Sequence, residues 1–545
     1  APCRSGCPIE QDIPAYLMKV GEGKYEEALR IITQRNALPF ITGTICSHRC
    51  QDKCMRNAYD ESVYIRAQKL KAAEGGFEAL LPKLRPAAPA AGRRVAVVGG
   101  GPGGMSAAYF LGRAGVDVTV FERRDALGGI VRHVIPAFRI PGEAIDNDVR
   151  LMEAMGVKVE LNTEVKDVQE LFAQGFTHVI LATGAWQKGS AGLEYGEEHN
   201  VIEFLEAAKK APDTLNLGRH VVVIGGGNTA MDAARAAKRL PGVETVSLVY
   251  RRTRRYMPAD QEELELALAD GVEFRELLAP VGVRDGVLTC KVMELGAPDA
   301  TGRRSPVEVP ADTVITAVGE KVDTKFYTAN GLAVDQRGRA VVNPDTLESS
   351  VPHVYVVGDG QKGPGTVVEA IAGAARAAQA IQPFDADAFV EQNVNPDYQK
   401  PLAKRGDVCT DCASCEDSRC LGCATVCETC TEVCPNRANV AVRVPGMRQR
   451  QIIHVDGMCN ECGNCATFCP YDSRPYQDKF TLFWSLADFD SSRNDGFLRL
   501  ENGRTRVRLG GQVADYDVSD AACGLYDPLR RLICAVYENY AYLLG

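Results

Sequence analysis

The sequence contains no run of eighteen apolar residues, and its first residues show no basic start followed by an apolar core. A membrane-spanning helix and a secretory signal are therefore not expected, and the pattern predicts a cytoplasmic protein without membrane insertion. Excess positive charge is also absent, because the formal net charge is -9 and basic residues gather only in short patches such as residues 250–256. This charge pattern predicts no nucleic-acid partner.

Cysteine is almost absent from the middle of the chain, where Cys290 stands alone between residues 54 and 409, although the sequence has 20 cysteines. Five lie between residues 3 and 54 and twelve between residues 409 and 469. A disulfide framework would not cluster in this way. In a reducing compartment, thiols two or three residues apart are better explained as metal ligands. Cys290, Cys523 and Cys534 are predicted to be buried thiols without a role.

A glycine-rich turn lies between a predicted strand over residues 95–98 and a predicted helix. It places Gly99, Gly101 and Gly104 at the spacing of a dinucleotide-binding fold, and Glu122 ends the next predicted strand. The glycines allow a pyrophosphate to approach a helix N-terminus, while Glu122 can accept hydrogen bonds from an adenosine ribose. The alternative is a glycine-rich turn without a ligand.

A second segment ends a predicted strand with Gly358 and Asp359. An aspartate at this place is often only a helix cap. The segment nevertheless resembles the second FAD motif of two-domain flavin reductases, which implies that Asp359 binds the ribityl chain. Residues 128–141, GGIVRHVIPAFRIP, match the same reductases and imply that Gly129 and Arg132 lie near the flavin. Together with Glu122, these segments predict FAD.

Another fingerprint, VVVIGGGNTAMDAARAAKRL, lies between the two FAD motifs. It predicts a second nucleotide-binding domain inserted into the first. Its candidate cofactor-binding residues are Gly225, Gly227, Asn228 and Ala230.

The strand after this fingerprint ends in Tyr250 rather than in the acidic residue typical of an NAD site, and arginines follow it. A 2′-phosphate needs cations and would be repelled by a carboxylate, so the pattern predicts NADPH. The resemblance favours Arg251 and Arg255 as ligands of the phosphate, while Arg252 and Arg254 can equally be solvated surface charges. Hydride transfer from nicotinamide to flavin needs stacked rings, so no catalytic acid–base side chain is predicted.

The run CNECGNCATFCP, residues 459–470, has the spacing of a bacterial ferredoxin, in which the fourth cysteine serves the other cluster. Residues 423–435 supply the required partner run. Two 4Fe-4S clusters are predicted, one on Cys423, Cys427, Cys430 and Cys469, and the other on Cys434, Cys459, Cys462 and Cys465. Zinc is the alternative metal. A third set, Cys409, Cys412, Cys415 and Cys420, could hold another cluster, zinc or no metal, and Cys420 could replace Cys423.

Residues 1 to about 80 have helical spacing and contain Cys3, Cys7, Cys46, Cys50 and Cys54. This segment resembles the N-terminal double-cluster domain of the glutamate synthase small subunit and of dihydropyrimidine dehydrogenase. The resemblance implies that Cys7, Cys46 and Cys50 share a cluster, with Gln68 as a further ligand or as an ordinary helix residue. It also implies that Cys3 and Cys54 hold another cluster with two cysteines upstream of Ala1, so the chain is expected to be the later part of a longer polypeptide.

The expected fold class is α/β, with two nested Rossmann-like nucleotide-binding domains of glutathione-reductase type between an α-helical iron–sulfur domain and a ferredoxin-like domain. The expected domains are residues 1–85 (helical, iron–sulfur), 95–215 (FAD, first part), 216–320 (NADPH), 321–384 (FAD, second part), 407–475 (ferredoxin-like) and 476–545 (a β-rich and helical tail).

Over nearly its whole length the sequence resembles the iron–sulfur subunit family of selenate reductases. The combined motifs predict an NADPH-dependent flavin and iron–sulfur oxidoreductase that exchanges electrons with a separate catalytic site. The resemblance implies an upstream domain or a catalytic subunit, such as a molybdenum hydroxylase of the xanthine dehydrogenase type. The alternatives are a glutamate synthase small-subunit-type reductase, an electron-bifurcating flavoprotein subunit, and a structural or sensory protein that keeps nucleotide-binding folds as a scaffold.

Overall fold

The computed structural model describes residues 1–58, 61–294, 306–384, 419–420, 427–447 and 450–545. The chain divides into two compact units. The larger unit contains residues 25–47 and the described residues from 69 to 384, and the smaller one contains residues 1–24, 48–68 and the described residues from 419 onward. Among the helices that the structure describes, none combines the length and apolarity needed to cross a membrane.

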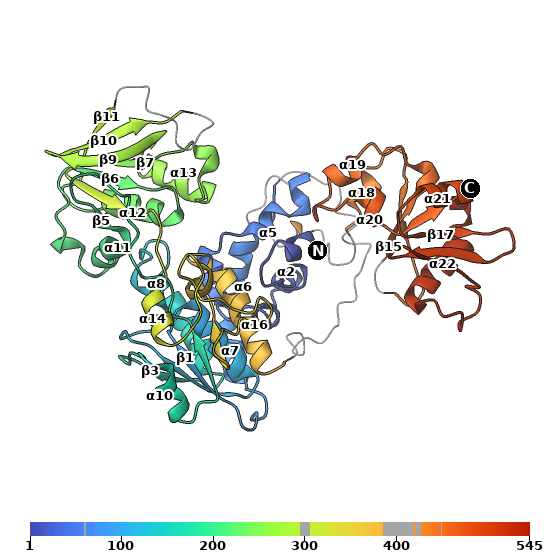
Figure 1. Cartoon of the computed structure of the whole chain (residues 1–545), viewed down its shortest axis with the longest axis horizontal. Coiled ribbons are helices and arrows are strands. Elements are labelled where there is room, and N and C mark those ends of the chain that lie inside the picture. Colours follow the sequence, from blue (N-terminus) through green and yellow to red (C-terminus); the bar gives the residue numbers. More distant parts are fainter. Residues whose placement is uncertain (59–60, 295–305, 385–418, 421–426, 448–449) are drawn as a thin grey trace. The chain divides into compact units, whose positions relative to one another are not determined.

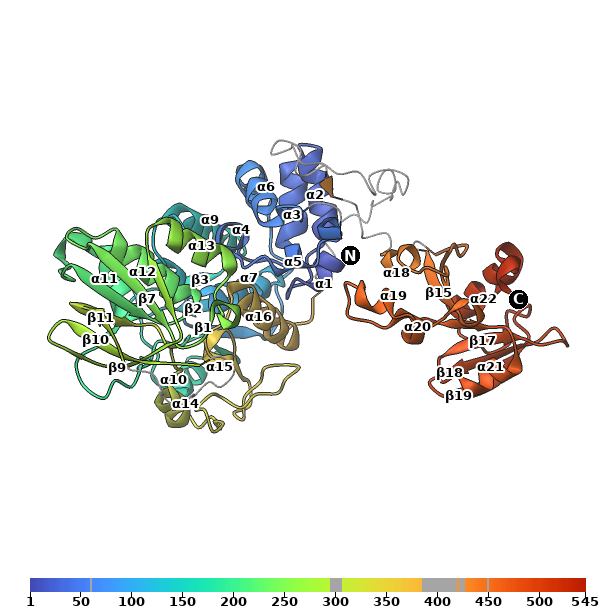
Figure 2. The ribbon, with the colours of Figure 1, turned by 90° about the horizontal axis from the view of Figure 1, so that it is seen from above.

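The first sheet of the larger unit is parallel and has the strand order β13-β4-β1-β2-β3. Its strands are β1 (Arg94–Val98), β2 (Asp117–Phe121), β3 (Lys158–Glu160), β4 (His178–Leu181) and β13 (Val354–Val356). The apolar run of β1 is buried because helices cover a parallel sheet on both faces. Two of these helices, α7 (Pro102–Arg113) and α16 (Val367–Ile381), lie side by side next to β1 (Figure 2).

The second sheet is also parallel and has the order β5-β12-β6-β7-β8. Its strands are β5 (His199–Asn200), β6 (His220–Ile224), β7 (Thr245–Tyr250), β8 (Glu273–Glu276) and β12 (Thr313–Thr316). All of them lie in the chain between β4 and β13 of the first sheet, so the predicted nesting of two nucleotide-binding folds is confirmed. β5 lies before the boundary expected at residue 215, and it pairs with β12 of the second sheet.

Three antiparallel strands extend the second domain: β9 (Leu278–Arg284), β10 (Val287–Val292) and β11 (Val307–Pro310). Its main helices are α11 (Val201–Lys210), α12 (Asn228–Lys238) and α13 (Gln261–Ala269). Shorter elements of the larger unit are α8 (Gly129–His133), α9 (Gly142–Glu153), α10 (Val168–Ala173), α14 (Thr324–Ala329), α15 (Asp359–Lys362), η2 (Leu81–Lys83), η3 (Pro212–Thr214) and η4 (Arg254–Tyr256).

The N-terminal helices, expected as one domain over residues 1–85, are divided between the two units. The helices α3 (Tyr25–Thr33) and α4 (Pro39–Ile45) belong to the larger unit, and α6 (Ile65–Leu80) crosses the division. The reason is the buried carboxylate of Asp148 on α9, which accepts the backbone N–H groups of Phe40 at 3.1 Å and Ile41 at 2.8 Å. These bonds satisfy donors at the start of α4, so they attach it to the first nucleotide-binding domain.

In the smaller unit, the N-terminal elements are α1 (Pro2–Ser5), α2 (Ile13–Gly21), α5 (Arg49–Asp52) and η1 (Met55–Ala58). The C-terminal part, orange to red in Figure 1, has a six-stranded sheet of order β14-β15-β16-β17-β18-β19. Its strands are β14 (Asn439–Val442), β15 (Gln451–Val455), β16 (Thr481–Phe483), β17 (Gly496–Arg499), β18 (Thr505–Leu509) and β19 (Gln512–Tyr516).

This sheet runs across the boundary expected at residue 475, because β15 before the boundary pairs directly with β16 after it. The helix α22 (Asp527–Asn539) packs on the same core through Leu532, Ile533 and Val536. The segment 476–545 is therefore part of one folded body with β14 and β15. The remaining short elements are α18 (Thr429–Glu432), α19 (Asn464–Thr467), α20 (Pro475–Asp478), α21 (Leu486–Ser491), η6 (Asp456–Met458) and η7 (Ala541–Leu543).

Candidate functional site

A cavity of about 350 Å³ lies in the larger unit, at the carboxyl ends of the first sheet's strands. Its walls include Gly99 after β1, Glu122 after β2, Thr183 after β4 and Asp359 after β13. Ligands of open parallel sheets bind at this edge, and the volume is within the usual range for cofactor sites. The cavity is therefore the candidate flavin site.

The glycine turn after β1 fits a closely approaching phosphate group. Gly99 has a φ of +104°, and a Cβ atom added there would overlap the carbonyl oxygen of Ala182. A Cβ added at Gly104 would overlap the carbonyl oxygen of Gly99, so this glycine lets α7 pack on β1. Gly101 differs, because the nearest atom to an added Cβ is 3.7 Å away, and this residue lines the cavity. The open space beside Gly101 is where a pyrophosphate would approach the start of α7.

Glu122 is held rigidly at the end of β2. Its two carboxylate oxygens accept the backbone N–H groups of Gly100 at 2.7 Å and Arg124 at 2.8 Å. Because each carboxylate oxygen has a second lone pair, Glu122 can still accept a bond from a ribose hydroxyl.

The two residues expected near the flavin from segment 128–141 differ in their surroundings. Gly129 lines the cavity. Arg132 does not line it, because its guanidinium donates to the carbonyl oxygen of Leu127 and forms an ion pair with Asp146 at 2.5 Å. The structure thus brings Gly129, but not Arg132, to the cavity wall.

Asp359 is one of the polar residues that line the cavity. Burial raises the pKa of its carboxyl to about 7, opposed by the backbone N–H of Gly365, which donates to it at 3.1 Å. Near neutral pH this carboxyl can therefore donate as well as accept a hydrogen bond, which suits a ligand hydroxyl.

The second fingerprint faces the same cavity. Gly227 precedes α12, and Asn228, Thr229 and Asp232 of this helix line the cavity. Asn228 and Asp260 exchange two hydrogen bonds, at 3.0 Å and 2.9 Å, which orient the start of the helix. Ala230 is fully buried, and a Cβ added at Gly225 would overlap the carbonyl oxygen of Ala317. Gly225 and Ala230 thus serve close packing, while Asn228, held by Asp260, lies at the cavity wall at the start of α12.

The arginines after β7 are not equivalent. The side chains of Arg251, Arg252 and Arg255 are exposed and form no ion pair with any residue that the structure describes. Arg254 is paired with Glu265 at 3.4 Å. Three guanidinium groups are therefore available to a 2′-phosphate, and Arg254 is the weakest candidate of the four.

Cys46 also lines the cavity, although it comes from the N-terminal segment. It follows α4, which Asp148 attaches to the first nucleotide-binding domain. A thiol expected to bind an iron–sulfur cluster therefore lies at the wall of the candidate flavin site.

The ferredoxin-like cysteines of the smaller unit bring thiols of both runs together. Burial first, and then the nearby thiols of Cys427, Cys465 and Cys469, raise the pKa of Cys430 to about 12. Burial and the thiols of Cys434 and Cys465 likewise raise the pKa of Cys459.

Backbone N–H groups complete these surroundings. The N–H of Ala438 donates to the sulfur of Cys434 at 3.2 Å, and that of Glu461 donates to the sulfur of Cys459 at 3.3 Å. Such bonds are typical around cluster thiolates. The described cysteines therefore fit the interleaved pattern of two 4Fe-4S clusters. Cys409, Cys412, Cys415 and Cys423 lie outside the described residues.

The N-terminal cysteines of the smaller unit have two distinct surroundings. Cys3, Cys54 and Cys420 line one small pocket. Cys7 is buried, and the Cα of Cys50 lies near Gly6. No three His, Cys, Asp or Glu side chains of the described parts are arranged around a single metal ion.

The surroundings of Gln68 independently favour its side-chain oxygen as a ligand of a cluster. Its Oε1 atom is buried and has no hydrogen-bond partner among the residues that the structure describes. An unpaired buried oxygen is costly, so it fits a group that binds to it. This supports the interpretation of Gln68 as a cluster ligand over that of an ordinary helix residue.

Several cavity residues were not predicted from sequence. Trp186 lies on the wall beneath the guanidinium of Arg124, whose centre is 4.5 Å from the ring, and Arg139 and Asp232 line the wall on the other side. The only local signal was the match of residues 128–141 to flavin reductases, which contains Arg139.

Comparison with known proteins places these sites in a family. Residues 93–374 match the family described as pyridine nucleotide-disulphide oxidoreductase. Residues 1–75 match a domain described as dihydropyrimidine dehydrogenase domain II, 4Fe-4S cluster.

Three relatives illustrate the likeness. The protein named "Putative oxidoreductase YgfK" from Escherichia coli (strain K12) is 44% identical over the whole of this chain, which spans 55% of that relative's length. The NADP(+)-dependent formate dehydrogenase subunit beta of Moorella thermoacetica is 36% identical over 74% of this chain and 63% of its own length. The glutamate synthase [NADPH] small chain of Escherichia coli (strain K12) is 32% identical over 70% of this chain and 87% of its own length.

These matches confirm the predicted oxidoreductase class and the predicted FAD, NADPH and 4Fe-4S cofactors. The family model covers more than half of the sequence, including both glycine fingerprints. The chain therefore belongs to the pyridine nucleotide-disulphide oxidoreductase family.

Proposed function

We propose that this chain is the NADPH-dependent flavin and iron–sulfur module of a larger oxidoreductase and exchanges electrons with a separate catalytic site. One observation carries the proposal: residues of both FAD motifs, residues of the nicotinamide fingerprint and Cys46 line a single cavity. A nicotinamide and a flavin bound there would stack, with a cluster ligand at the wall.

With both cofactors bound, the cavity would support NADPH + H⁺ + FAD → NADP⁺ + FADH₂, and the flavin would supply the conversion from a two-electron donor to one-electron acceptors. The protein's own residues bind and orient. Glu122 and Asp359 would hold the sugar portions, the open space at Gly101 would admit the pyrophosphate, and the exposed arginines after Tyr250 would select NADPH.

The cluster ligands remain a proposal that the donor groups support. We assign one C-terminal cluster to Cys423, Cys427, Cys430 and Cys469, and the other to Cys434, Cys459, Cys462 and Cys465. In the N-terminal segment we assign Cys7, Cys46, Cys50 and Gln68 to one cluster, on the evidence of the unpaired Oε1 of Gln68. Cys3 and Cys54 would serve a second cluster. Cys420 lines the same small pocket as Cys3 and Cys54. A separate cluster on Cys409, Cys412, Cys415 and Cys420 is therefore the weaker assignment.

A catalytic partner or further domain is part of the proposal. The named relatives include a subunit beta and a small chain, which are parts of larger enzymes. We favour a molybdenum hydroxylase as the partner and the cytoplasm as the location. Selenate reduction is one candidate activity of the complete enzyme. Mass spectrometry of the proteins that copurify with the native full-length protein tests the identity of the partner.

Anaerobic stopped-flow spectroscopy tests the function directly. Mixing the reconstituted protein with NADPH should bleach the flavin absorbance, and NADH should do so more slowly at equal concentration. No bleaching by NADPH would disprove the proposal. Equal or faster bleaching by NADH would disprove only the assignment of the arginines.

The glutamate synthase small-subunit type is the second candidate, because a relative of that name aligns over 87% of its length. It predicts glutamine- and 2-oxoglutarate-dependent NADPH oxidation when a large amidotransferase subunit is added. The additional folded body from β14 to α22 favours the first candidate, because it follows the part of the chain that matches the nucleotide-binding family.

A further inference from the structure

The segment from Pro136 to Pro141 connects α8 to α9 in the first nucleotide-binding domain, and it projects onto the second domain. The amine of Lys209 on α11 donates to the carbonyl oxygen of Ile135 at 2.6 Å. Val134 packs in the same apolar core as Phe204 and Met231 of the second domain. Val134 and Ile135, which precede the segment, therefore attach it to the second domain through apolar and polar contacts.

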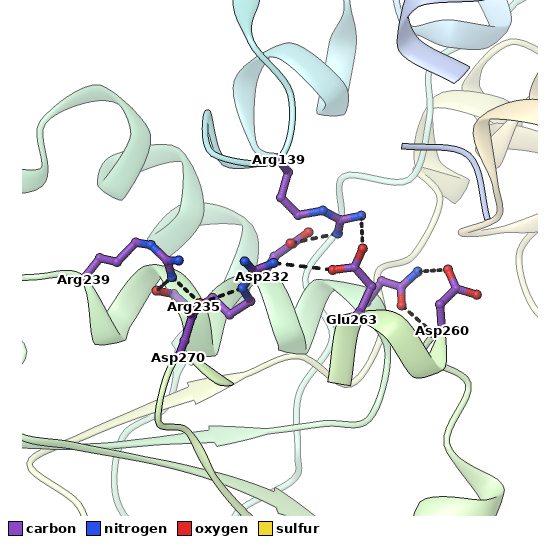
Figure 3. Close-up of polar contacts among 8 residues, drawn as sticks. Arg139, Asp232, Arg235, Arg239, Asp260, Glu263 and Asp270 are labelled. Atoms are coloured by element: carbon purple, nitrogen blue, oxygen red, sulfur yellow. Dashed lines mark hydrogen bonds and ion pairs between the residues drawn. The ribbon is translucent and has the colours of Figure 1, made fainter. Parts of the chain in front are cut away.

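Arg139 extends from this segment into a buried ion-pair cluster (Figure 3). Its guanidinium donates to Asp232 on α12 at 2.9 Å and contacts Glu263 on α13 at 2.7 Å. Only 10% of the Arg139 side chain is exposed, and the two carboxylates are as deeply buried. Arg139 thus joins three elements, and it is the only member of the cluster labelled in Figure 3 that comes from the first domain.

The neighbouring residue Phe138 adds a second contact to α12. The guanidinium centres of Arg235 and Arg239 lie 4.9 Å and 4.2 Å from its ring centroid, which is the geometry of cation–π interactions. The same two arginines pair with Asp270, at 2.8 Å and 2.6 Å. Phe138 therefore packs against guanidinium groups that carboxylates already hold in place.

Carboxylates outnumber the cations of this cluster, so Arg139 is needed to limit the excess of negative charge. Its cations are Arg139, Arg235 and Arg239, and its anions are Asp232, Glu263, Asp270 and the neighbouring Asp260. Burial raises the pKa of Asp232 to about 6 against the attraction of Arg139. Removing Arg139 would leave buried carboxylates short of one partner, and breaking such a pair is strongly unfavourable.

We propose that Phe138 and Arg139 form an interdomain clamp that positions the nicotinamide-binding helix α12 against the flavin site, so that Arg139 is a positioning residue for hydride transfer. This inference rests on the proposed function. Asp232 shares its helix with Asn228 and Thr229, and all three line the cavity with the FAD motifs. Fixing Asp232 therefore fixes the position of α12 at the cavity that would hold both cofactors.

A direct role of Arg139 in binding a phosphate is the competing explanation. It is less favoured because two of the guanidinium nitrogens are already held by buried carboxylates. The two roles differ in kinetics. A phosphate ligand contributes to the affinity for NADPH, whereas a positioning residue contributes to the limiting rate at saturating NADPH, because small misplacements of reacting groups are costly.

The test compares Arg139→Gln with the wild type in anaerobic flavin reduction over a range of NADPH concentrations. We expect the limiting reduction rate to fall roughly tenfold to a hundredfold, while the apparent Kd for NADPH changes less than about threefold. The charge-transfer absorbance between NADP⁺ and reduced flavin should weaken in parallel. Phe138→Ala should produce a smaller loss of the same kind, and Arg139→Lys should restore part of the rate.

Arg219→Gln is the matched control, because Arg219 forms an exposed ion pair with Glu244, at 2.6 Å, within the second domain alone. It should leave both constants unchanged. If Arg139→Gln does not retain FAD, the limiting reduction rates and the Kd values of Arg139→Lys and Phe138→Ala decide between positioning and nucleotide binding.

Two results count against the clamp, and a third bears on the proposed function. An unchanged limiting rate overturns the clamp, and a raised Kd with an unchanged rate assigns Arg139 to nucleotide binding. Failure of the wild type to reduce its flavin with NADPH would instead refute the proposed function, so the two failures are distinguishable.

Discussion

The hydroxyl of Tyr250 donates a hydrogen bond to the carbonyl oxygen of Tyr256 at 2.7 Å. The ring of Tyr250 also covers Gly226, where an added Cβ would collide with it. This bond closes the loop that carries Arg251 to Arg255, at the place where NAD sites have a carboxylate. Tyr250 thus stands where an acidic side chain would repel a 2′-phosphate. Its hydrogen bond also orders the loop whose arginines would attract that phosphate.

The first prediction concerns these arginines. The double substitution of Arg251 and Arg255 by Gln should raise the Kd for NADPH roughly a hundredfold or more, because two charge-assisted bonds to phosphate, each contributing about 1.5–3 kcal/mol, would be lost. The affinity for NADH should change little, since it has no 2′-phosphate. Titration of the oxidised protein with NADP⁺ and NAD⁺ measures both. Arg254→Gln is the control, and an equal loss for both nucleotides would contradict the assignment.

The second prediction uses the open space at Gly101. Gly101→Ala should fold normally, because the nearest atom to the added Cβ is 3.7 Å away. It should bind FAD at least about tenfold more weakly, or about 1.4 kcal/mol, because the methyl group occupies the path of the pyrophosphate. Flavin release during dialysis measures this loss. Gly142→Ala, where an added Cβ meets nothing within 4 Å, is the control that should keep its FAD.

The third prediction separates the two interpretations of Gln68. Gln68→Leu should lower the iron content by about four atoms per chain if the side chain is a cluster ligand. If Gln68 is instead an ordinary helix residue, removing its unpaired Oε1 should stabilise the protein by about 1–3 kcal/mol and leave the iron content unchanged. Iron analysis and EPR spectra after anaerobic reconstitution decide between them.

The fourth prediction concerns acid sensitivity of the C-terminal body. Burial lowers the pKa of His454 to about 4, and its ring contacts Asn439, whose amide donates to the carbonyl oxygen of Cys430 at 3.2 Å. Below the ordinary histidine pKa of 6.5, the unfolded state binds a proton that the folded state does not, so stability falls as the pH drops from 6.5 toward 4.

Urea denaturation at several pH values, followed by the visible absorbance of the clusters, measures this dependence. His454→Gln should lower stability at every pH, because it disturbs a buried contact, but it should flatten the decline between pH 6.5 and 4. An unchanged slope would show that other groups cause the acid sensitivity.

Short motifs allowed much of the fold and several candidate cofactor-binding residues to be predicted from the sequence alone. Gly99, Gly101 and Glu122 could be placed because a tight turn, a close approach and a strand-end acid are local backbone requirements at fixed spacing. The spacing of Cys459, Cys462 and Cys465 is likewise local, since one short loop carries all three. The nesting of one nucleotide fold in another followed from the order of these motifs.

Only the tertiary structure decided what distant segments do together. Arg139 and Asp232 are 93 residues apart, and no local pattern states that they form a buried ion pair. The place of Cys46 at the flavin cavity depends on Asp148, more than 100 residues later, and β15 pairs with β16 across an expected domain boundary. Such contacts form only when whole surfaces are buried against each other. The pairing of charges and the fit of shapes then depend on how the elements pack, and no local sequence pattern specifies that.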